Sequence, residues 1–423
     1  MSTMTKVPPH RPCRSFTEEF KANRRPLVLY TGLLGLPGSG AAIEHALNVA
    51  KTLEAAGYNA LLLPWAEDGR PEDRLPSGLF CCQGIHYLPV GNPSTDGSSR
   101  LESLKVYTGA RSPVLRMLHG SDLAGVTAII TMEGSAGFSW KLRSLCRSRG
   151  IKLIGEVTEW YAATSWLQSS SVIERIDQEA RLRTVYPTYD GIIAITSCLE
   201  DYYSRRGCKV LRLPPVLDTG AVRWSRPLRD EAPRAGLRLV FSGTPGRDRQ
   251  DVILNAILQS RGQGRDVSIE YVGCSRESVL ASLGRCPNLL NTLGDAVVCH
   301  GRVGEEQLRS IMASADFGIL LREEAPWSRS CFPSKVPEFL SLGVPIICNL
   351  TGDLGTYLDD AKEALIAPDT SVTALGKTLA RAIDLSPSQK KQMQQYSRLK
   401  AESHFDIRRH ANLLGGFIRK IAQ

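Results

Sequence analysis

The chain has 423 residues, of which 42% are hydrophobic and 22% are charged, and its formal net charge is +9. These proportions are ordinary for a globular protein, and the length favours two domains that each bury a core. The sequence contains no run of about 18 apolar residues, which excludes a membrane-spanning helix. A polar, basic start without an apolar signal-peptide core leads us to expect a cytoplasmic protein.

The cysteine and charge content also limits the kinds of partner. Eleven cysteines are scattered without metal-ligand spacing, and the seven histidines show no pairing pattern, so we expect no metal site. The positive balance suits a polyanion, an anionic lipid surface or a phosphorylated substrate, and it equally fits a solvated surface rich in arginine. Because no arginine run is interleaved with aromatic residues, nucleic acid is not an expected partner.

The first half of the chain alternates short apolar runs with amphipathic stretches, which predicts a parallel α/β architecture. Residues 1–25 are expected to form a disordered or loosely attached arm. A first strand at Leu27–Tyr30 leads into the glycine-rich segment Gly32–Gly40, and a helix follows at Ala41–Ala56. Further strands are expected at Ala60–Leu63, Val126–Thr131, Lys152–Gly155, Gly191–Thr196 and Val210–Leu213.

The glycine-rich segment is a candidate acceptor or phosphate loop, because it joins a strand to a helix. Gly38, Ser39 and Gly40 would let the backbone approach a phosphate or an acceptor closely. The segment is neither a G-x-G-x-x-G motif nor a Walker loop. A simple strand–helix turn explains it as well as a binding role does.

Two carboxylates follow a later strand, in the segment I-K-L-I-G-E-V-T-E-W-Y. Glu156 lies just beyond the apolar run and Glu159 three residues later. Either side chain could line a cleft as a base, as a partner of an acceptor hydroxyl or as an orienting group. Alternatively, Glu159 caps a helix or pairs with an arginine, and Trp160 only packs.

The second half repeats the architecture. Residues 216–236 combine proline, glycine and charge, which is typical of a linker between an N-terminal domain (26–215) and a C-terminal domain (237–370). Helices are expected over 371–423, the last of them, near Arg408–Ile421, crossing towards the N-terminal domain. Strands are expected at Leu237–Phe241, Ser268–Val272, Val297–His300, Phe317–Leu321 and Val344–Cys348. Two Rossmann-like, doubly wound parallel-sheet domains would face a cleft, where the carboxyl ends of strands bind ligands.

A basic turn follows the first strand of the second half. It contains Gly243, Thr244, Arg247 and Arg249. Two guanidinium groups at a strand end are suited to a pyrophosphate, because each can donate to phosphate oxygens in a fork geometry. A solvated basic turn is the alternative.

Two further strand ends carry basic residues. In V-C-H-G-R-V-G-E, the loop containing Arg302 and Val303 could hold a nucleobase through its backbone. Arg322, Arg329 and Lys335 would form a positive cluster above another strand end, and such a cluster stabilises charge on a departing phosphate. Ion pairing with the adjacent glutamates at 323 and 324 is the alternative for Arg322.

The segment Ser330–Cys348 reads as a loop, a short helix, a glycine stop and a buried strand. Ser334 is a candidate N-cap, Lys335 and Glu338 fall in the first turn, and Gly343 ends the helix. A helix N-terminus carries unpaired amides and a partial positive charge, which suit an anion. A carboxylate one turn further on could accept hydrogen bonds from two sugar hydroxyls. The segment therefore predicts a nucleotide-sugar site.

These residues form a recognisable pattern. L-L-R-E followed by R-S-C-F-P-S-K-V-P-E-F-L-S-L-G-V-P-I-I resembles the donor-binding segment of the retaining GT-B glycosyltransferases, glycosyl transferases group 1. The chain looks most like members that act in bacterial capsule, exopolysaccharide and surface-glycan synthesis. S-G-T-P-G-R-D and D-G-I-I-A-I-T-S-C-L are similar to the first loop of the C-terminal domain and to the last N-domain strand of that group.

The resemblance implies a role for each candidate. By position, Glu338 would bond the ribose hydroxyls, Ser334 and Lys335 would meet the phosphates, and the loop at Arg302 and Val303 would face the base. The catalytic candidates are Glu156, Glu159, Arg247 and Lys335. The donor-binding candidates are Gly243, Thr244, Arg249, Arg302, Val303, Arg322, Ser334 and Glu338.

The implied reaction moves a hexose-type sugar from a nucleotide diphosphate donor, with UDP or GDP, to a glycan or lipid-linked acceptor. It would proceed with retention and without a metal or other cofactor, at a basic surface suited to the anionic inner face of the membrane. Many members carry a glutamate where this chain has Ser330. The alternatives are a nucleotide-sugar epimerase on the same fold, a dinucleotide-dependent oxidoreductase, and a non-catalytic partner that binds a nucleotide sugar or glycan.

Overall fold

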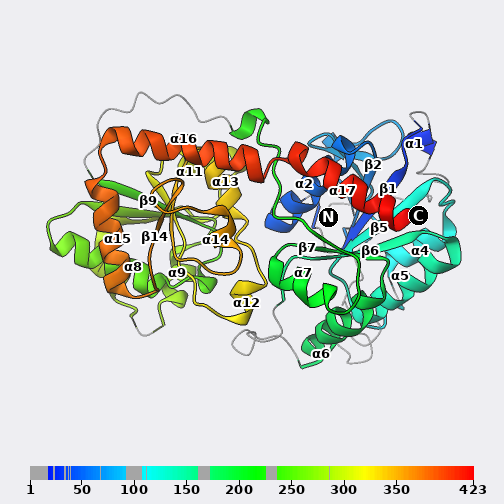
Figure 1. Cartoon of the computed structure of the whole chain (residues 1–423), viewed down its shortest axis with the longest axis horizontal. Helices are drawn as coiled ribbons and strands as arrows, with labels where there is room; N and C mark the ends of the chain where they lie inside the picture. Colours follow the sequence, from blue (N-terminus) through cyan, green and yellow to red (C-terminus); the bar gives the residue numbers. More distant parts are fainter. Residues whose placement is uncertain are drawn as a thin grey trace, which may run out of the picture.

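The computed structural model describes residues 18–21, 24–32, 35–36, 38, 40–66, 68–91, 107–110, 112–160, 172–224, 236–284 and 286–423. Most of the expected arm and residues 225–235 of the expected linker lie outside these ranges. Within the arm, the short helix α1 (Glu18–Lys21) buries Phe20, whose ring meets that of His86 edge-on. Figure 1 shows two α/β domains side by side, joined along one edge by a long helix.

The N-terminal domain is built on an eight-stranded sheet with the order β3-β4-β2-β1-β5-β6-β7-β8. All neighbouring pairs are parallel except β3 and β4, which are antiparallel. Buried strands that are apolar on both faces, such as β1, are typical of parallel sheets covered by helices on each side. The strands are β1 (Leu27–Gly32), β2 (Asn59–Pro64), β3 (Phe80–Cys82), β4 (Ile85–Tyr87), β5 (Val126–Met132), β6 (Lys152–Val157), β7 (Gly191–Ala194) and β8 (Val210–Arg212).

Helices cover both faces of this sheet (Figure 1). The α-helices are α2 (Ala41–Ala55), α4 (Pro113–Gly120), α5 (Ala136–Arg149), α6 (Val172–Ala180) and α7 (Ser197–Ser204). Shorter turns are η1 (Pro71–Asp73), the π-helical η3 (Arg181–Val185), η4 (Tyr186–Thr188) and η5 (Val222–Trp224). Three helices start where the sequence provides a hydroxyl cap, since Ser112, Ser135 and Thr196 accept from amides of the first turn.

The C-terminal domain has a six-stranded parallel sheet with the order β11-β10-β9-β12-β13-β14. Its strands are β9 (Leu237–Ser242), β10 (Val267–Val272), β11 (Val297–Cys299), β12 (Phe317–Ile319), β13 (Ile346–Cys348) and β14 (Ala364–Ile366). Its helices are α8 (Gln250–Gly262), α9 (Arg276–Ser282), α10 (Leu289–Leu293), α11 (Glu305–Ala313), α12 (Pro326–Arg329), α13 (Lys335–Ser341), α14 (Leu354–Tyr357) and α15 (Val372–Asp384), with the turns η6 (Pro245–Arg247) and η7 (Gly294–Ala296).

The last two helices connect the domains. α16 (Pro387–His404) lies on the C-terminal domain, and α17 (Ile407–Ala422) packs against α2 of the N-terminal domain (Figure 1). The buried face of α17 includes Leu414, Ile418 and Ile421. The prediction of two parallel-sheet α/β domains with a C-terminal helix that returns to the N-terminal domain is therefore confirmed.

The chain crosses between the domains at two places that are hydrogen-bonded to each other. Leu217, after the last N-domain strand, donates its amide to Phe405 O at 2.7 Å and accepts from the amide of Ile407 at 3.0 Å. Arg398 of α16 donates to Thr219 O at 2.7 Å and to Trp224 O at 3.3 Å. The two crossings thus form one connected unit.

Candidate active site

A cavity of about 590 Å³ lies between the two domains. The N-terminal domain lines it with the start of α2 and with the residues that follow β5 and β6. The C-terminal domain lines it with the turn after β9, the loop after β11, the end of β12 and the start of α13. The carboxyl ends of both parallel sheets therefore point into it, which is where open α/β sheets bind ligands.

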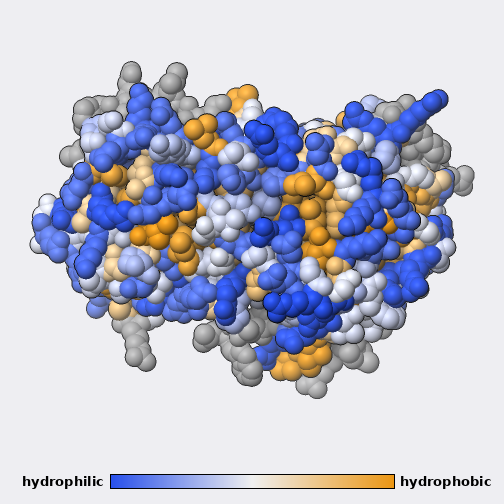
Figure 2. All heavy atoms as spheres, in the orientation of Figure 1, coloured by the Kyte–Doolittle hydropathy of each residue, from blue (hydrophilic) through white to orange (hydrophobic). Residues whose placement is uncertain are grey.

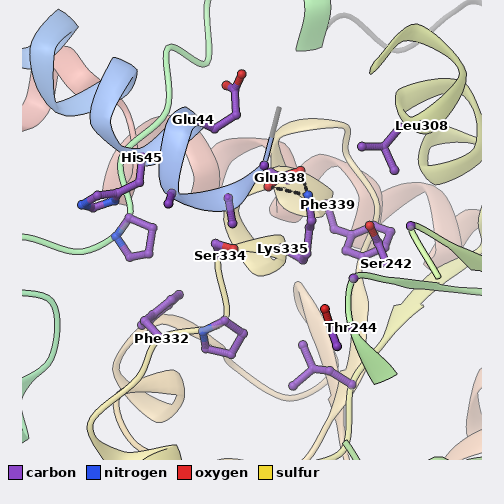
Figure 3. Close-up of a pocket in the computed structure, with 18 of the residues that line it drawn as sticks. Glu44, His45, Ser242, Thr244, Leu308, Phe332, Ser334, Lys335, Glu338 and Phe339 are labelled. Carbon is purple, nitrogen blue, oxygen red and sulfur yellow. Dashed lines mark hydrogen bonds and ion pairs between the residues drawn. The ribbon is translucent and has the colours of Figure 1, made fainter. Parts of the chain in front are cut away.

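The start of α13 forms one side of the cavity. Ser334 occupies the N-cap position, but its hydroxyl makes no hydrogen bond to an amide of the first turn, so the expected side-chain cap is not formed. Lys335 Nζ lies 2.9 Å and 2.7 Å from the two carboxylate oxygens of Glu338. Figure 3 shows this pair between His45 of the N-terminal domain and Thr244 of the C-terminal domain. Gly343 follows the helix at φ 67°, as a glycine stop requires.

Arg322 is fixed on the cavity wall by a buried carboxylate. Its Nε lies 3.5 Å from Asp248 Oδ1, and the same oxygen accepts from the amide of Leu321 at 3.1 Å. Burial raises the pKa of Asp248, and the charge of Arg322 opposes that rise. Arg322 therefore pairs with Asp248 and not with the adjacent glutamates at 323 and 324. The sequence alone did not suggest this partner.

Arg247 and Glu159 meet across the cleft. Arg247 Nη1 lies 3.5 Å from Glu159 Oε2, which links the turn after β9 to the residues beyond β6. Burial raises the pKa of Glu159 to about 7, and Arg247 opposes the rise. Trp160 has a packing role, which was the alternative to a role in the cleft. Its ring meets that of Tyr202 edge-on, and its Nε1 donates to Glu179 at 3.1 Å.

Three predicted site residues that the structure describes, Glu156, Arg249 and Gly38, lie outside the cavity lining. Glu156 is only 3% exposed, and its carboxylate accepts from Tyr30 OH and lies 2.8 Å from His45 Nε2. Glu156 therefore contacts His45 from within the domain and does not face the cavity. The sequence placed Glu156 correctly at the strand end, but side chains alternate along a strand and this one points into the domain.

Arg249 was predicted to bind the donor, and the structure does not place it in the cavity lining. Its guanidinium makes two hydrogen bonds to Asp251, at 2.9 Å and 2.7 Å, and a third to Glu323 at 2.9 Å. Three acidic contacts turn it away from the cavity, so of the two arginines in this turn only Arg247 lines it. Ser330, at 3% exposure, also points inward and donates to Trp160 O at 3.3 Å.

The remaining donor candidates lie together on the C-terminal wall. Gly243 and Thr244 follow β9, and Arg302 and Val303 follow β11. In the glycine-rich segment Gly40 lines the cavity, Gly38 bonds to Gly35 O at 2.8 Å outside the lining, and Ser39 lies outside the described residues.

Sequence reasoning missed His45 and Glu133, which line the N-terminal wall. Glu133 follows β5 with φ 67°, a conformation that residues other than glycine rarely adopt and that often marks functional sites. Burial raises the pKa of Glu133, and Arg181 opposes the rise. The sequence could have indicated Glu133, because it follows an apolar run in the same way as Glu156 does.

The described residues contain neither a metal-binding cluster nor a membrane-spanning helix. No group of three or more histidine, cysteine, aspartate or glutamate side chains in the described part of the chain is arranged to hold a metal ion. No helix within the same residues has the length and apolar character needed to cross a bilayer.

Comparison with known proteins gives a family match in the C-terminal half. Residues 236–384 match the family model of glycosyl transferases group 1. No curated protein matches the chain.

Several solved structures share the fold over nearly the whole chain. Sucrose-phosphate synthase from Thermosynechococcus elongatus is similar with a TM-score of 0.71 at 16% identity, covering 94% of this chain and 99% of that one. An α,α-trehalose-phosphate synthase (UDP-forming) from Burkholderia xenovorans, in complex with glucose-6-phosphate, gives 0.64 at 10% identity, covering 94% and 100%. HepE from Anabaena, in complex with UDP and glucose, gives 0.62 at 14% identity, covering 92% and 98%.

Two α/β domains face one cavity, and the domain that carries the basic strand ends is the one that the family model matches. The chain is a transferase, a glycosyltransferase of the GT-B fold with a glycosyl transferases group 1 domain at residues 236–384.

Proposed function

We propose that the protein transfers a hexose-type sugar from a nucleotide diphosphate donor, bound by the C-terminal domain, to an acceptor hydroxyl held against the N-terminal domain. The observation that carries this proposal is the start of α13, where Ser334, Lys335 and Glu338 line the cavity beside Arg322 and opposite Arg247. These are the residue types that a diphosphate and a ribose require.

The Lys335–Glu338 ion pair suggests how the donor would enter. In the structure each side chain satisfies the other, at 2.9 Å and 2.7 Å. A diphosphate would give Lys335 a new acceptor, and the ribose hydroxyls would give Glu338 new donors. Binding would thus replace one charge-assisted contact with several, so neither charge is left without a partner.

The proposed reaction needs positive charge where the diphosphate leaves. Arg247, Arg322 and Lys335 supply it, together with the amides at the N-terminus of α13. We propose that these groups suffice for departure of the nucleotide without a bound metal or cofactor. From the resemblance to retaining glycosyltransferases we also propose that the anomeric configuration is retained and that the protein acts in surface-polysaccharide synthesis. NMR of the product would determine the configuration.

A panel of nucleotides and nucleotide sugars tests the donor site by calorimetry and thermal shift, because a ligand of the folded state raises Tm. HepE was solved with UDP and glucose, which makes UDP-glucose the first donor to try. We expect Glu338→Gln and Lys335→Ala each to weaken nucleotide binding by about tenfold or more, since a charge-assisted contact contributes about 1.5–3 kcal/mol.

Glu324→Gln is the matched control, because Glu324 pairs with Arg329 outside the cavity lining. Unchanged UDP affinity in Glu338→Gln would refute the assignment of the donor site. Turnover of the sugar nucleotide without any acceptor would favour an epimerase instead.

The contact with an anionic membrane is proposed on the surface of α5 and α6. Val172, Ile173 and Ile176 of α6 are 60%, 51% and 64% exposed, and Trp140 of α5 is 53% exposed. Asp177 and Glu179 of α6 are half-buried, since Asp177 accepts from the amide of Ala136 at 3.0 Å and Glu179 accepts from Trp160 Nε1 at 3.1 Å, whereas Glu174 is exposed. A surface helix normally buries its apolar face, so the three exposed apolar side chains of α6 favour an apolar environment outside the protein.

Basic residues accompany this apolar surface. α5 carries Lys141, Arg143 and Arg147, and the Arg143 guanidinium lies 5.3 Å from the centre of the Trp140 ring. Figure 2 shows an apolar patch at the lower edge of the N-terminal domain, at the position of α6, bordered by hydrophilic side chains. Exposed apolar and aromatic side chains beside lysine and arginine suit the interface of an anionic bilayer.

Co-sedimentation with phosphatidylglycerol vesicles tests the membrane proposal. We expect the triple change Val172→Ser, Ile173→Ser and Ile176→Ser to abolish binding without loss of UDP affinity. The control is Leu399→Ser, which removes an equally exposed apolar residue (59%) from α16. Equal binding of both variants, or equal binding to neutral vesicles, would contradict the proposal.

A further inference from the structure

The two walls of the cavity differ in charge. From the N-terminal domain the ionisable lining residues are Glu44, His45, Glu133 and Glu159. From the C-terminal domain the basic lining residues are Arg247, Arg302, Arg309, Arg322 and Lys335. The positive charge that a phosphate needs therefore lies on the donor side, and the acceptor side is acidic.

One arginine reaches the N-terminal side, and it is neutralised. Arg223 of η5 lies in the connection between the domains, and its Nη2 is 2.9 Å from Glu44 Oε2. Glu44 also accepts from Gln83 at 2.8 Å. Among the described lining residues of the N-terminal domain itself there is no lysine or arginine.

Two undescribed segments of the N-terminal domain adjoin lining residues in the sequence. In the loop between β1 and α2, residues 33, 34, 37 and 39 are leucine, leucine, proline and serine. Residues 161–171, which follow Glu159 and Trp160, read Y-A-A-T-S-W-L-Q-S-S-S. Neither segment contains a lysine or an arginine.

Glu133 and Glu159 disfavour the binding of an anion at this wall. Burial raises the pKa of both carboxyl groups, and the charge of Glu133 contributes to the rise at Glu159. Each group is therefore poorly compensated when ionised, although Arg181 and, for Glu159, Arg247 oppose the rise. Arg181 is 8% exposed and is not part of the cavity lining, so it offers no direct contact to a ligand. A nearby ammonium group would favour the ionised carboxylates, and a phosphate would oppose them.

We propose that the acceptor presents a sugar without a phosphate group to this wall. An amino-substituted sugar is preferred, with its ammonium group beside Glu133 and Glu159. This proposal rests on the glycosyl transfer proposed above. Carboxyl groups also accept hydrogen bonds from sugar hydroxyls, so a neutral sugar would bind more weakly but productively. Like charges placed together at a binding site cost several kcal/mol, which corresponds to about 100-fold or more in affinity.

The experiment compares three small acceptors on the UDP-bound protein: glucosamine, glucose and glucose-6-phosphate. Calorimetry gives affinities whether or not transfer occurs, and product formation is followed with the donor found by the nucleotide panel. We expect the affinity order glucosamine, glucose, glucose-6-phosphate, with about 100-fold between the first and the last. Equal or tighter binding of glucose-6-phosphate would overturn the inference while leaving the proposed function intact. Absence of nucleotide binding would instead refute the proposed function, and the inference with it.

Variants assign the preference to the two carboxylates. Glu133→Gln and Glu159→Gln should each reduce the ratio of glucosamine to glucose affinity by about tenfold, since each removes one charge–charge contact. UDP affinity reports whether the fold and donor site survive. Glu277→Gln changes an exposed carboxylate on α9 that is not among the lining residues, so it is the matched control and should leave the ratio unchanged. A ratio that is the same in all three variants would overturn the assignment.

Discussion

Glu159 faces groups of both signs, and its ionisation should therefore be visible in the stability of the protein. Arg247 lies 3.5 Å away, Glu133 and Arg181 act on it through their charges, and burial raises its pKa to about 7. In the unfolded chain the carboxyl titrates near the ordinary value of 4.5. Between these two values the folded state holds more protons than the unfolded state, so stability falls as pH rises.

The variant Glu159→Gln removes this titration. We expect the difference in Tm, variant minus wild type, to increase as pH rises from about 5 to about 8. Because 27% of the Glu159 side chain is exposed, solvent limits the size of the effect. Thermal unfolding followed by circular dichroism at several pH values measures it, and a pH-independent difference would contradict the assigned pKa shift.

At the scale of single residues, the sequence indicated which strand ends matter but not how each side chain turns. Lys335, Glu338, Arg322 and Arg247 reach the cavity as expected. Arg249 does not, because Asp251 and Glu323 bind its guanidinium from the other side. Pairings of this kind depend on the folded path of the chain, so a pattern along the sequence cannot show them.

Among the elements, the junction between β1 and β5 supports the site through a close backbone contact. Gly32 ends β1 at φ 152°, and a Cβ atom there would lie 1.8 Å from the carbonyl oxygen of Met132. Met132 and Glu133 both line the cavity. A side chain at position 32 would therefore push the end of β5 away and disturb the acceptor wall.

We expect Gly32→Ala to cost more than about 3 kcal/mol of unfolding free energy, the range of a strained backbone combined with an overpacked core. Gly376→Ala is the control: it lies within α15, nothing lies within 4 Å of its added Cβ, and a helical glycine replaced by alanine gains about 0.5–1 kcal/mol. Denaturant unfolding of both variants measures the difference. Equal stabilities would show that β5 adapts without cost.

Most strands that the sequence predicted are apolar runs that the structure buries, although β8 and β11 are partly exposed, whereas β3, β4 and β14 were missed. Each of these three has only three residues. In β3 every residue is only partly buried, and β4 carries His86 between two buried neighbours. Such short segments have no periodicity of their own, and they become strands because a neighbouring strand supplies the hydrogen bonds.

For the whole molecule, Arg398 couples α16 to the inter-domain connection and to the C-terminal domain. It donates to Thr219 O and Trp224 O in the inter-domain connection and to Ser341 O at the end of α13. Three carbonyl groups from two segments thus share one guanidinium. Its loss would leave them without that donor and would loosen the contact between the domains.

We expect Arg398→Met to lower the unfolding free energy by about 2–4 kcal/mol and to separate the unfolding of the two domains, since charged hydrogen bonds contribute about 1.5–3 kcal/mol each. Lys391→Met, an exposed position on the same helix, is the control. Calorimetry should resolve two transitions in the first variant and leave the second like wild type. A single unshifted transition in Arg398→Met would contradict this role.

The hydrogen bonds that join Leu217 to Phe405 and Ile407 set the kind of motion that the two halves can make. Because the polypeptide passes between the domains at two points tied to each other, neither half can slide freely or separate. The remaining freedom is a rotation about an axis through that paired segment. A rotation that opened the cavity would break contacts across it, such as Arg247 Nη1 to Glu159 Oε2 at 3.5 Å, whereas the hydrogen bonds of Leu217 would persist.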